Sequence, residues 1–416
     1  MVYLFCALIV ILLLLSWKYV LRLEPAGIFA AIWVFFAVSV LLLDNYIDLN
    51  YEGCTFVLAG VIFFVTGTLF SDYFYRPTPS ETQWELRKKW VTPLLLILLA
   101  GAMVNPLYSI ILHGFSLRAL LDMREVLEMN KGISEDRYAG AEAHDVVNQF
   151  FLIFSYAAPV IGGLCYRLVG KFNKVLCVIT LIPCTFIALT QSLKMGMIAS
   201  FILFFAAYIV CSYTYGLPIR IKGKVILRFA LVIVGFLGTL FISMVFRTGE
   251  VSEKTILEIS EKFVSYAIGH MHNVDRWFTS YQPTDLTWGS RTFLGISNLL
   301  GIEERVQGIY PEFMNVGKNG FYGISNTFTI FRPLVEDFGE VGAMVAMFVM
   351  GIFANMSLKA VTAHRAVIFN QVVLVAIFAY LMWSFSASFY AYTTYLAMFA
   401  LVFVLFHVIQ KRVSVC

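Results

Sequence analysis

The chain has 416 residues, 60 % of them hydrophobic and only 13 % charged, with a mean hydropathy of +0.81. A soluble domain is about 45–50 % apolar and about 25 % charged, so this composition excludes an ordinary soluble protein. The formal net charge of +4 indicates no partner by itself, and we expect neither a nucleic acid partner nor a cofactor. The seven cysteines form no CxxC pair, so no disulfide framework or zinc site is expected.

Apolar segments close to bilayer length recur from one end of the chain to the other. They cover residues 2–17, 26–43, 54–70, 91–112, 146–166, 173–190, 195–212, 228–246, 338–357, 366–383 and 386–409. A helix of about 20 apolar residues crosses the hydrocarbon, where the backbone has no hydrogen-bond partner except itself. We therefore predict an all-α, multi-pass protein with about eleven transmembrane helices in a single membrane domain, residues 1–416.

Basic residues in the short loops indicate an orientation. If the N-terminus is outside, every short inner loop contains Lys or Arg, whereas the short outer loops contain only Lys194. Cytoplasmic loops carry an excess of Lys and Arg, so the C-terminus is expected in the cytoplasm. Two long loops, 113–145 and 247–337, then face the periplasm or the cell exterior.

The second long loop, 247–337, is predicted to be a helical cap on the membrane. Between Ser252 and about Ser280, large side chains recur at steps of three and four, as on one face of a helix. They are Ile256, Ile259, Phe263, Tyr266, His270, Val274 and Trp277. Aromatic and apolar residues remain frequent up to Phe328, so we expect further short helices rather than an open loop.

Several cations on the predicted outer side are candidates for binding a phosphate group. They are Arg124 in the first long loop, Lys194 at the start of a span, Arg247 at the end of one, and Arg291 and Arg332 in the second long loop. Basic residues at an interface can also simply extend to lipid headgroups. An arginine fork, however, binds phosphate oxygens in a bidentate manner, as a pyrophosphate site requires.

The string GHMHNVDRW contains two histidines, His270 and His272. On a helix, residues two apart face different directions, and no carboxylate or cysteine cluster completes a metal site. We therefore predict no metal. His270 is a candidate for packing, hydrogen bonding or general base catalysis, while Asp275 and Arg276 are expected on the solvated face of the same helix.

The string SNTFTIFRPLVEDFGEVGA, residues 325–343, is the most distinctive in the chain. Arg332 precedes a proline, and Glu336-Asp337-Phe338-Gly339 leads into the next apolar segment. An acidic residue at a helix start is favourable to the helix dipole, so Asp337 is either a cap or a catalytic group.

An Asn-x-x-Thr segment beginning at Asn326, followed by aromatics, Pro and Asp-Phe-Gly-x-x-Gly, resembles the bacterial oligosaccharide repeat unit polymerases, the Wzy-type O-antigen polymerases. The basic stretch SLRALLDMREV, the cation at Lys194 and the large outer loop before the last spans extend the resemblance over nearly the whole chain. The family often has Ser-Arg-Gly where this chain has Ser-Leu-Lys-Met-Gly around Lys194.

The resemblance implies a GT-C-like glycosyltransferase in the bacterial inner membrane, with its active site facing the periplasm. It would move a growing glycan from undecaprenyl-pyrophosphate to a lipid-linked repeat unit, with inversion and without a metal. Its partners would be undecaprenyl-pyrophosphate-linked oligosaccharides, membrane lipids and a chain-length regulator. The expected pyrophosphate ligands are Arg247, Arg332, Lys194, Arg124 and Arg291. The expected base is Asp337, Glu336 or His270, and the expected glycan ligands are Asn326, Asp275 and Arg276.

Other functions stay open at the level of sequence. An O-antigen ligase has a similar architecture and the same donor. A lipid-linked oligosaccharide flippase or other transporter would share the membrane helices, but such proteins usually have short loops on both sides. A non-catalytic membrane scaffold is the remaining alternative.

Overall fold

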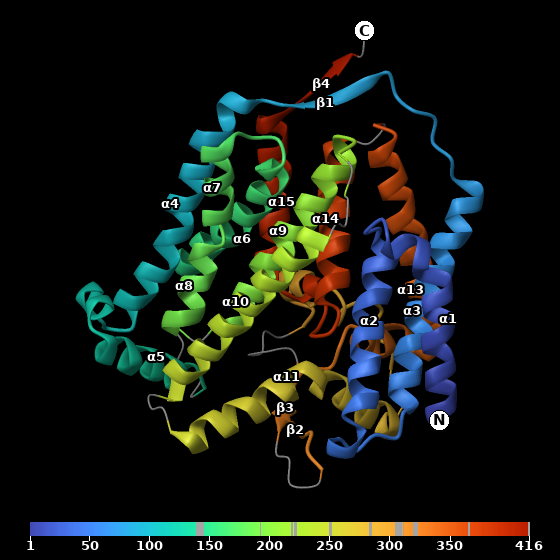
Figure 1. The fold of residues 1–416 in the computed structure, drawn as a ribbon, viewed down its shortest axis with the longest axis horizontal. Helices are drawn as coiled ribbons and strands as arrows, with labels where there is room; N and C mark the ends of the chain where they lie inside the picture. Colours follow the sequence, from blue (N-terminus) through green and yellow to red (C-terminus); the bar gives the residue numbers. More distant parts are fainter. Residues whose placement is uncertain are drawn as a thin grey trace. The chain divides into compact units, whose positions relative to one another are not determined.

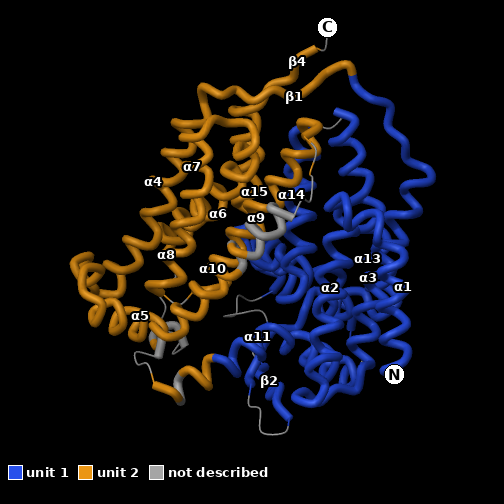
Figure 2. Tube along the Cα trace, viewed as in Figure 1, with its two compact units in different colours: residues 1–80, 260–396 blue, residues 81–259, 397–416 orange. Residues whose placement is uncertain are grey.

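The computed structural model describes the chain except for several short segments. The described residues are 1–138, 145–191, 193–217, 219, 223–248, 252–282, 285–303, 310, 312–318, 323–364 and 367–414, without the side chains of 136–138, 223–230, 232–233, 247–248 and 254–255. The chain forms two compact units, coloured separately in Figure 2. Unit 1 comprises Met1–Ser80 and Ser260–Leu396, and unit 2 comprises Glu81–Ile259 and Ala397–Cys416.

Unit 1 is helical with one small strand pair (Figure 1). Its elements are α1 (Val2–Val20), α2 (Pro25–Leu42), η1 (Asp44–Tyr46), α3 (Glu52–Phe74), most of α11 (Glu253–Ser280), α12 (Leu294–Leu299), β2 (Met314–Asn315), β3 (Ile324–Ser325), α13 (Phe331–Thr362), α14 (Ile368–Trp383), η3 (Phe389–Ala391) and the start of α15 (Thr393–Ile409). Strands β2 and β3 are antiparallel, with Met314 opposite Ser325.

Unit 2 contains the remaining helices and an antiparallel ribbon (Figure 1). Its elements are β1 (Thr82–Leu86), α4 (Lys88–Leu112), η2 (Leu117–Leu121), α5 (Met123–Tyr138), α6 (Val146–Tyr166), α7 (Lys171–Ile179), α8 (Ile182–Gln191), α9 (Lys194–Thr214), α10 (Gly223–Thr248), the end of α15 and β4 (Gln410–Ser414). Strand β1 pairs with β4.

The prediction of a helical membrane protein is confirmed in its coarse form. Within the described part of the chain, eight helical segments are long and apolar enough to cross a membrane. They are Val2–Val20, Pro25–Leu42, Glu52–Phe74, Lys88–Leu112, Val146–Tyr166, Lys171–Gln191, Lys194–Thr214 and Phe331–Thr362. Of the three other apolar segments of the sequence, one falls on Val234–Phe246, a part of the 26-residue helix α10, and two fall on the shorter apolar helices Ile368–Trp383 and Thr393–Ile409. That these three also cross stays a prediction, as do the single domain and the GT-C-like fold.

Two of the expected spans are interrupted. The segment 173–190 consists of α7 and α8, which are separated at Thr180 and Leu181. Helix α13 begins before the predicted span 338–357 and changes direction at Gly339, where φ is +70° and ψ is 174°. This backbone conformation favours glycine because a side chain would be strained there. The Asp-Phe-Gly string therefore forms a break between two helical pieces of α13.

Helices α3 and α13 pack closely through small residues. A Cβ atom placed on Gly67 would lie 2.0 Å from the carbonyl oxygen of Phe348, and one placed on Gly351 would lie 2.0 Å from that of Phe64. The two glycines thus allow reciprocal backbone contact between the helices, as small residues do in membrane helix pairs.

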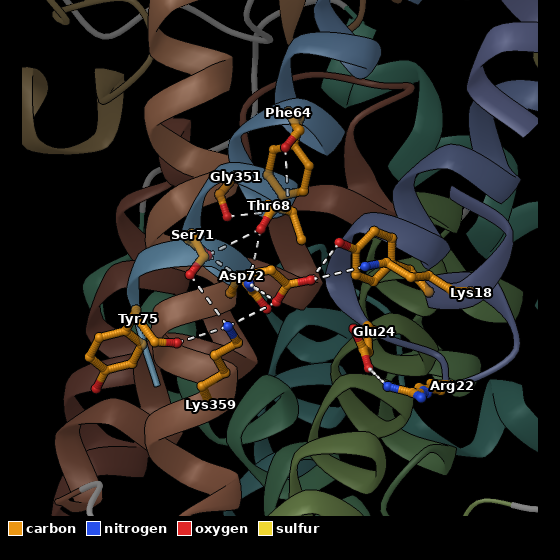
Figure 3. Close-up of polar contacts among 12 residues, drawn as sticks. Lys18, Arg22, Glu24, Phe64, Thr68, Ser71, Asp72, Tyr75, Gly351 and Lys359 are labelled. Atoms are coloured by element: carbon orange, nitrogen blue, oxygen red, sulfur yellow. Dashed lines mark hydrogen bonds and ion pairs between the residues drawn. The ribbon is translucent and has the colours of Figure 1, made fainter. Parts of the chain in front are cut away.

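A polar network joins α3 to α1 and α13 near the end of this interface (Figure 3). The Asp72 carboxylate accepts hydrogen bonds from Lys18 Nζ at 3.1 Å and the Tyr19 hydroxyl at 2.8 Å through one oxygen. The other oxygen accepts from Asn355 Nδ2 at 2.9 Å and pairs with Lys359 Nζ at 2.9 Å. One carboxylate therefore ties together the ends of three helices.

The predicted helix over Ser252–Ser280 is confirmed as α11, but its one-sided burial is only partly confirmed. Ile259, His270, Val274 and Trp277 are buried, whereas Ile256 and Tyr266 are exposed. Every residue from 268 to 275 is buried, so this stretch is enclosed on all sides within unit 1. A helical period predicts one buried face only, and full enclosure depends on tertiary neighbours that the period does not record.

We predict that Gly351→Ala destabilises the protein by about 1–3 kcal/mol or more, because the added methyl group overlaps the Phe64 carbonyl. Thermal unfolding of the purified protein in detergent measures the effect. Gly238→Ala in α10 is the matched control, since a Cβ at Gly238 meets no heavy atom of the described residues within 4 Å. An equal melting temperature for the two variants would contradict the close packing of α3 on α13.

Candidate functional site

The carboxylate of Asp337 binds the loop that precedes α12. One oxygen accepts from the Thr287 hydroxyl at 2.6 Å and from the backbone N–H of Arg291 at 2.9 Å. The other accepts from the backbone N–H of Thr292 at 2.7 Å, and the Trp288 N–H donates to the Asp337 carbonyl at 3.1 Å. Asp337 is fully buried and has three hydrogen-bond donors on its carboxylate. Its geometry is that of an anchor for residues 287–292.

Arg332, one turn earlier on α13, is almost fully buried and pairs with two carboxylates. Its Nε donates to Glu336 Oε1 at 2.8 Å, on the same face of the helix. Its two terminal nitrogens donate to the two oxygens of Glu312 at 2.9 and 3.1 Å. Three of the five N–H groups of the guanidinium are thus used, two of them in a bidentate fork.

Aromatic rings surround the same guanidinium. The Arg332 Cζ atom lies 3.8 Å from the ring centre of Tyr310, 4.3 Å from that of Phe328 and 5.4 Å from that of Trp277. The Tyr310 hydroxyl donates to the second oxygen of Glu336 at 3.4 Å. Cation–π contacts strengthen when water is excluded, so the cage holds the guanidinium in place.

Glu312 is the exposed member of this arrangement. Half of its side chain is accessible to solvent (51 %), against 8 % for Arg332 and 17 % for Glu336. Hydrogen bonds from Arg332 lower the pKa of Glu312 below its ordinary value, so this carboxylate is charged at neutral pH. The Arg332 fork therefore holds an anion that faces solvent.

Arg291, whose backbone N–H binds Asp337, is the second cation at this site. Its guanidinium pairs with Glu303 at 3.5 Å, and the Ser290 hydroxyl donates to the other oxygen of Glu303 at 2.8 Å. We call these charged residues, Arg291, Arg332, Glu303, Glu312, Glu336 and Asp337, the Arg332 cluster. It joins four residues of the predicted site, and it contains more carboxylates than cations.

Asp275 and Arg276 of α11 both have protein partners. The Asp275 carboxylate accepts from the backbone N–H groups of Asn50 at 2.7 Å, Tyr51 at 3.1 Å and Cys54 at 3.3 Å. It therefore caps the N-terminus of α3, where the first N–H groups lack helical acceptors. The Arg276 guanidinium pairs with Asp48. A role for either residue in glycan binding stays a prediction.

Asn326 lies between β3 and α13, in a segment that hydrogen-bonds to α11. The Asn273 side-chain amide donates to the carbonyls of Ser325 at 3.0 Å and Thr327 at 3.1 Å. Asn326 itself is half-buried between these two residues. Asn273, Tyr310 and Glu312 were missed at the level of sequence. Asn273 stands inside the polar string GHMHNVDRW, which was a usable signal, whereas Glu312 lies twenty residues from its partner.

His270 is fully buried among aromatic rings. Its ring lies 4.3 Å from that of Phe36, 5.9 Å from that of Phe385 and 6.0 Å from that of Trp33. Neither ring nitrogen has a hydrogen-bond partner among the described residues. Burial lowers the pKa of His270 to about 3, so the ring is neutral and accepts a proton poorly. Packing is the reading that this geometry favours, and catalysis by His270 stays a prediction.

The other predicted cations belong to unit 2. Lys194 is the first residue of α9 and is half-buried, while Arg124 is exposed near the start of α5. The backbone of Arg247 lies in the last turn of α10, and its side chain is outside the described part of the structure. Each unit is described by itself, so a clamp that combines Arg332 with these residues stays a prediction.

Among the described residues, no group of three or more His, Cys, Asp or Glu side chains could hold a metal ion. Whether the activity is independent of metals stays a prediction. Comparisons of the chain with models of known protein families, with curated proteins and with solved structures find no match in any of the three.

We predict that Asp337→Asn releases residues 287–292, because an amide nitrogen cannot accept the Thr292 N–H. Loss of a charged hydrogen bond is worth about 1.5–3 kcal/mol, so exchange of the Arg291 and Thr292 amides should accelerate about tenfold or more. Hydrogen–deuterium exchange in detergent measures it. Glu340→Gln, on an exposed residue one turn on, is the control and should leave these amides unchanged. Unaltered protection together with lost activity would instead favour Asp337 as the base.

Proposed function

We propose that this protein is an O-antigen or related oligosaccharide repeat unit polymerase of a bacterial inner membrane, acting at the periplasmic face. One observation carries the proposal beyond the resemblance of the sequence. At the start of α13, in the distinctive string, a caged arginine holds a solvent-facing anion in bidentate fashion. A carboxylate and a phosphate present similar pairs of oxygens to a guanidinium fork.

In the proposed reaction, a hydroxyl of the lipid-linked acceptor attacks the anomeric carbon of the growing glycan. The bond from that carbon to the undecaprenyl-pyrophosphate oxygen breaks, and the configuration inverts. Arginine donors oppose the charge that develops on the departing pyrophosphate, which is usually the largest catalytic contribution. Arg332 would supply this contact after Glu312 leaves the fork, and Arg291 is the other cation of the cluster.

The proton of the acceptor hydroxyl goes to a carboxylate. Of the three predicted bases, Glu336 fits best, because it is partly accessible and lies beside Arg332. The Asp337 carboxylate is fully buried and bound by three donors, and His270 is enclosed by aromatic rings. A base must reach the proton that it removes, so accessibility favours Glu336.

A deletion strain tests the proposal through its lipopolysaccharide ladder. A single repeat unit on the lipid A core is the expected result, because ligation proceeds without polymerisation. A complete absence of repeat units would contradict a polymerase and indicate an O-antigen ligase or a flippase.

We predict that Glu312→Gln lowers the KM for the lipid-pyrophosphate donor about two- to fivefold, because the variant removes the charge that competes for the Arg332 fork. This range follows from the roughly 1 kcal/mol that a half-exposed ion pair is worth at most. Arg332→Lys should lower kcat about tenfold to a thousandfold, since a lysine cannot form the bidentate fork. Polymerisation kinetics of the purified protein measure both effects.

Asp48→Asn is the matched control for Glu312→Gln, because Asp48 is a carboxylate of similar exposure that also pairs with an arginine. It should leave the donor KM unchanged. A donor KM that is equal in wild type and Glu312→Gln would mean that the Arg332 fork does not receive the donor.

A further inference from the structure

Unit 2 contains a polar ribbon that neither the fold nor the proposed function explains. Strand β1 pairs with β4 in antiparallel register, with Thr82 opposite Ser414 and Leu86 opposite Gln410. The ribbon is reinforced by an ion pair between Glu85 and Lys411 at 2.9 Å. At its end the Arg87 N–H donates to the Ile409 carbonyl at 2.7 Å, and α4 begins one residue later.

A pocket of about 460 Å³ lies where the ribbon meets the start of α4. Four basic residues line it, Arg87, Lys88, Lys89 and Lys411, together with Glu85 and the exposed ring of Trp90. The formal charge of these residues is four positive and one negative, and all five side chains are exposed. Such a pocket attracts an anion and disfavours an apolar molecule.

The first turn of α4 would also be stabilised by a bound negative charge. No side chain caps this helix end, and no acidic residue lies in its first turn. Three consecutive cations, from Arg87 to Lys89, instead stand where the helix dipole is positive. Cations at this end oppose the dipole, and a bound anion would reverse the effect.

The depth of the pocket in the membrane indicates whether its anion is a lipid phosphate or a free phosphate. Helix α4 is apolar enough to cross a membrane, and the pocket lies at its first residues. That is where hydrocarbon gives way to lipid headgroups, and Trp90 there matches the preference of Trp for this boundary. A lipid phosphate is already concentrated at this depth, whereas a free phosphate has to come from solution.

We propose that the pocket formed by β1, β4 and the start of α4 is a specific binding site for the phosphate headgroup of an anionic membrane lipid. The lipid phosphate lies among Arg87, Lys88, Lys89 and Lys411, and its acyl chains run beside α4. In this position it offsets the charge at the α4 N-terminus and fastens the ribbon to the helix. The site is independent of the proposed polymerase activity and rests only on α4 crossing the membrane.

Native mass spectrometry of the full chain in detergent tests the site, with phosphatidylglycerol as the probe and phosphatidylcholine as the zwitterionic comparison. The expected result is saturable retention of one phosphatidylglycerol, about tenfold or more weaker in Lys88→Gln/Lys89→Gln. Lys171→Gln/Lys174→Gln removes two charges at the start of α7, outside this pocket, and should leave binding unchanged.

Glu85→Gln gives a second, opposite measurement. It removes the carboxylate that pairs with Lys411, so phosphatidylglycerol should bind about two- to fivefold more tightly. A gain in affinity cannot arise from misfolding, so this variant decides the question if the double lysine variant fails to fold.

Four results would overturn the proposal. Equal retention of the two lipids, or an equal loss in the α7 control, would mean that the lipid is held by general attraction at the interface and not by this pocket. Displacement of the lipid by millimolar inorganic phosphate, which then binds with the same dependence on Lys88 and Lys89, would assign the site to a free phosphate. An unchanged affinity in Glu85→Gln would mean that the lipid phosphate does not lie beside Lys411, contrary to the proposal.

Discussion

The close packing of α3 on α13 is the constraint on which unit 1 depends. The reciprocal contacts of Gly67 and Gly351 fix the distance between the two helices, and a Cβ at Gly60 would meet the Phe331 ring at the start of α13. Residues 332–337 follow that ring directly, so the same interface fixes where the Arg332 cluster begins. Both ends of α3 are also held by carboxylates, from Asp275 at its first turn and from its own Asp72 near its last. A rigid helix pair of this kind can hold charged side chains in one geometry.

The arrangement of helices could be predicted from the sequence to the extent that each helix satisfies its own backbone. Every predicted apolar segment falls on a helix, because hydrocarbon-length runs leave the chain few alternatives. The breaks within the helical segments were harder to predict from the sequence. Gly339 was noticed only as part of the string that leads into an apolar segment, yet its positive φ breaks α13. Likewise α11 was predicted as a helix with one buried face, and its residues 268–275 are enclosed by segments far away in the sequence.

The motif in residues 325–343 located the candidate site, but it did not indicate what each of its residues does. Whether a buried aspartate anchors a loop or moves a proton depends on what donates to it. For Asp337 and Asp275 the donors are mostly backbone N–H groups of remote segments, about which side-chain identity carries no information. Glu312 was not predicted as a site residue for a related reason. Its contact with Arg332 comes from the tertiary fold, which brings Glu312 to α13, and not from a local period.

The three charged residues of the motif have different surroundings because of their positions on one helix. Arg332 and Glu336 are four residues apart and therefore lie on one face, where they pair directly. Asp337 is rotated by a further 100° or so, which turns its carboxylate to the 287–292 loop. The helix geometry thus directs Asp337 to the 287–292 loop, which it anchors, and leaves Glu336 beside the Arg332 guanidinium. In a largely apolar chain, a buried arginine without a counter-charge is costly, and Glu336 pairs with Arg332 from the same helix face. In the proposed reaction, Glu336 would stay paired with the guanidinium while the donor phosphate replaces the Glu312 carboxylate, and the phosphate would occupy the fork by the time Glu336 takes up the acceptor proton.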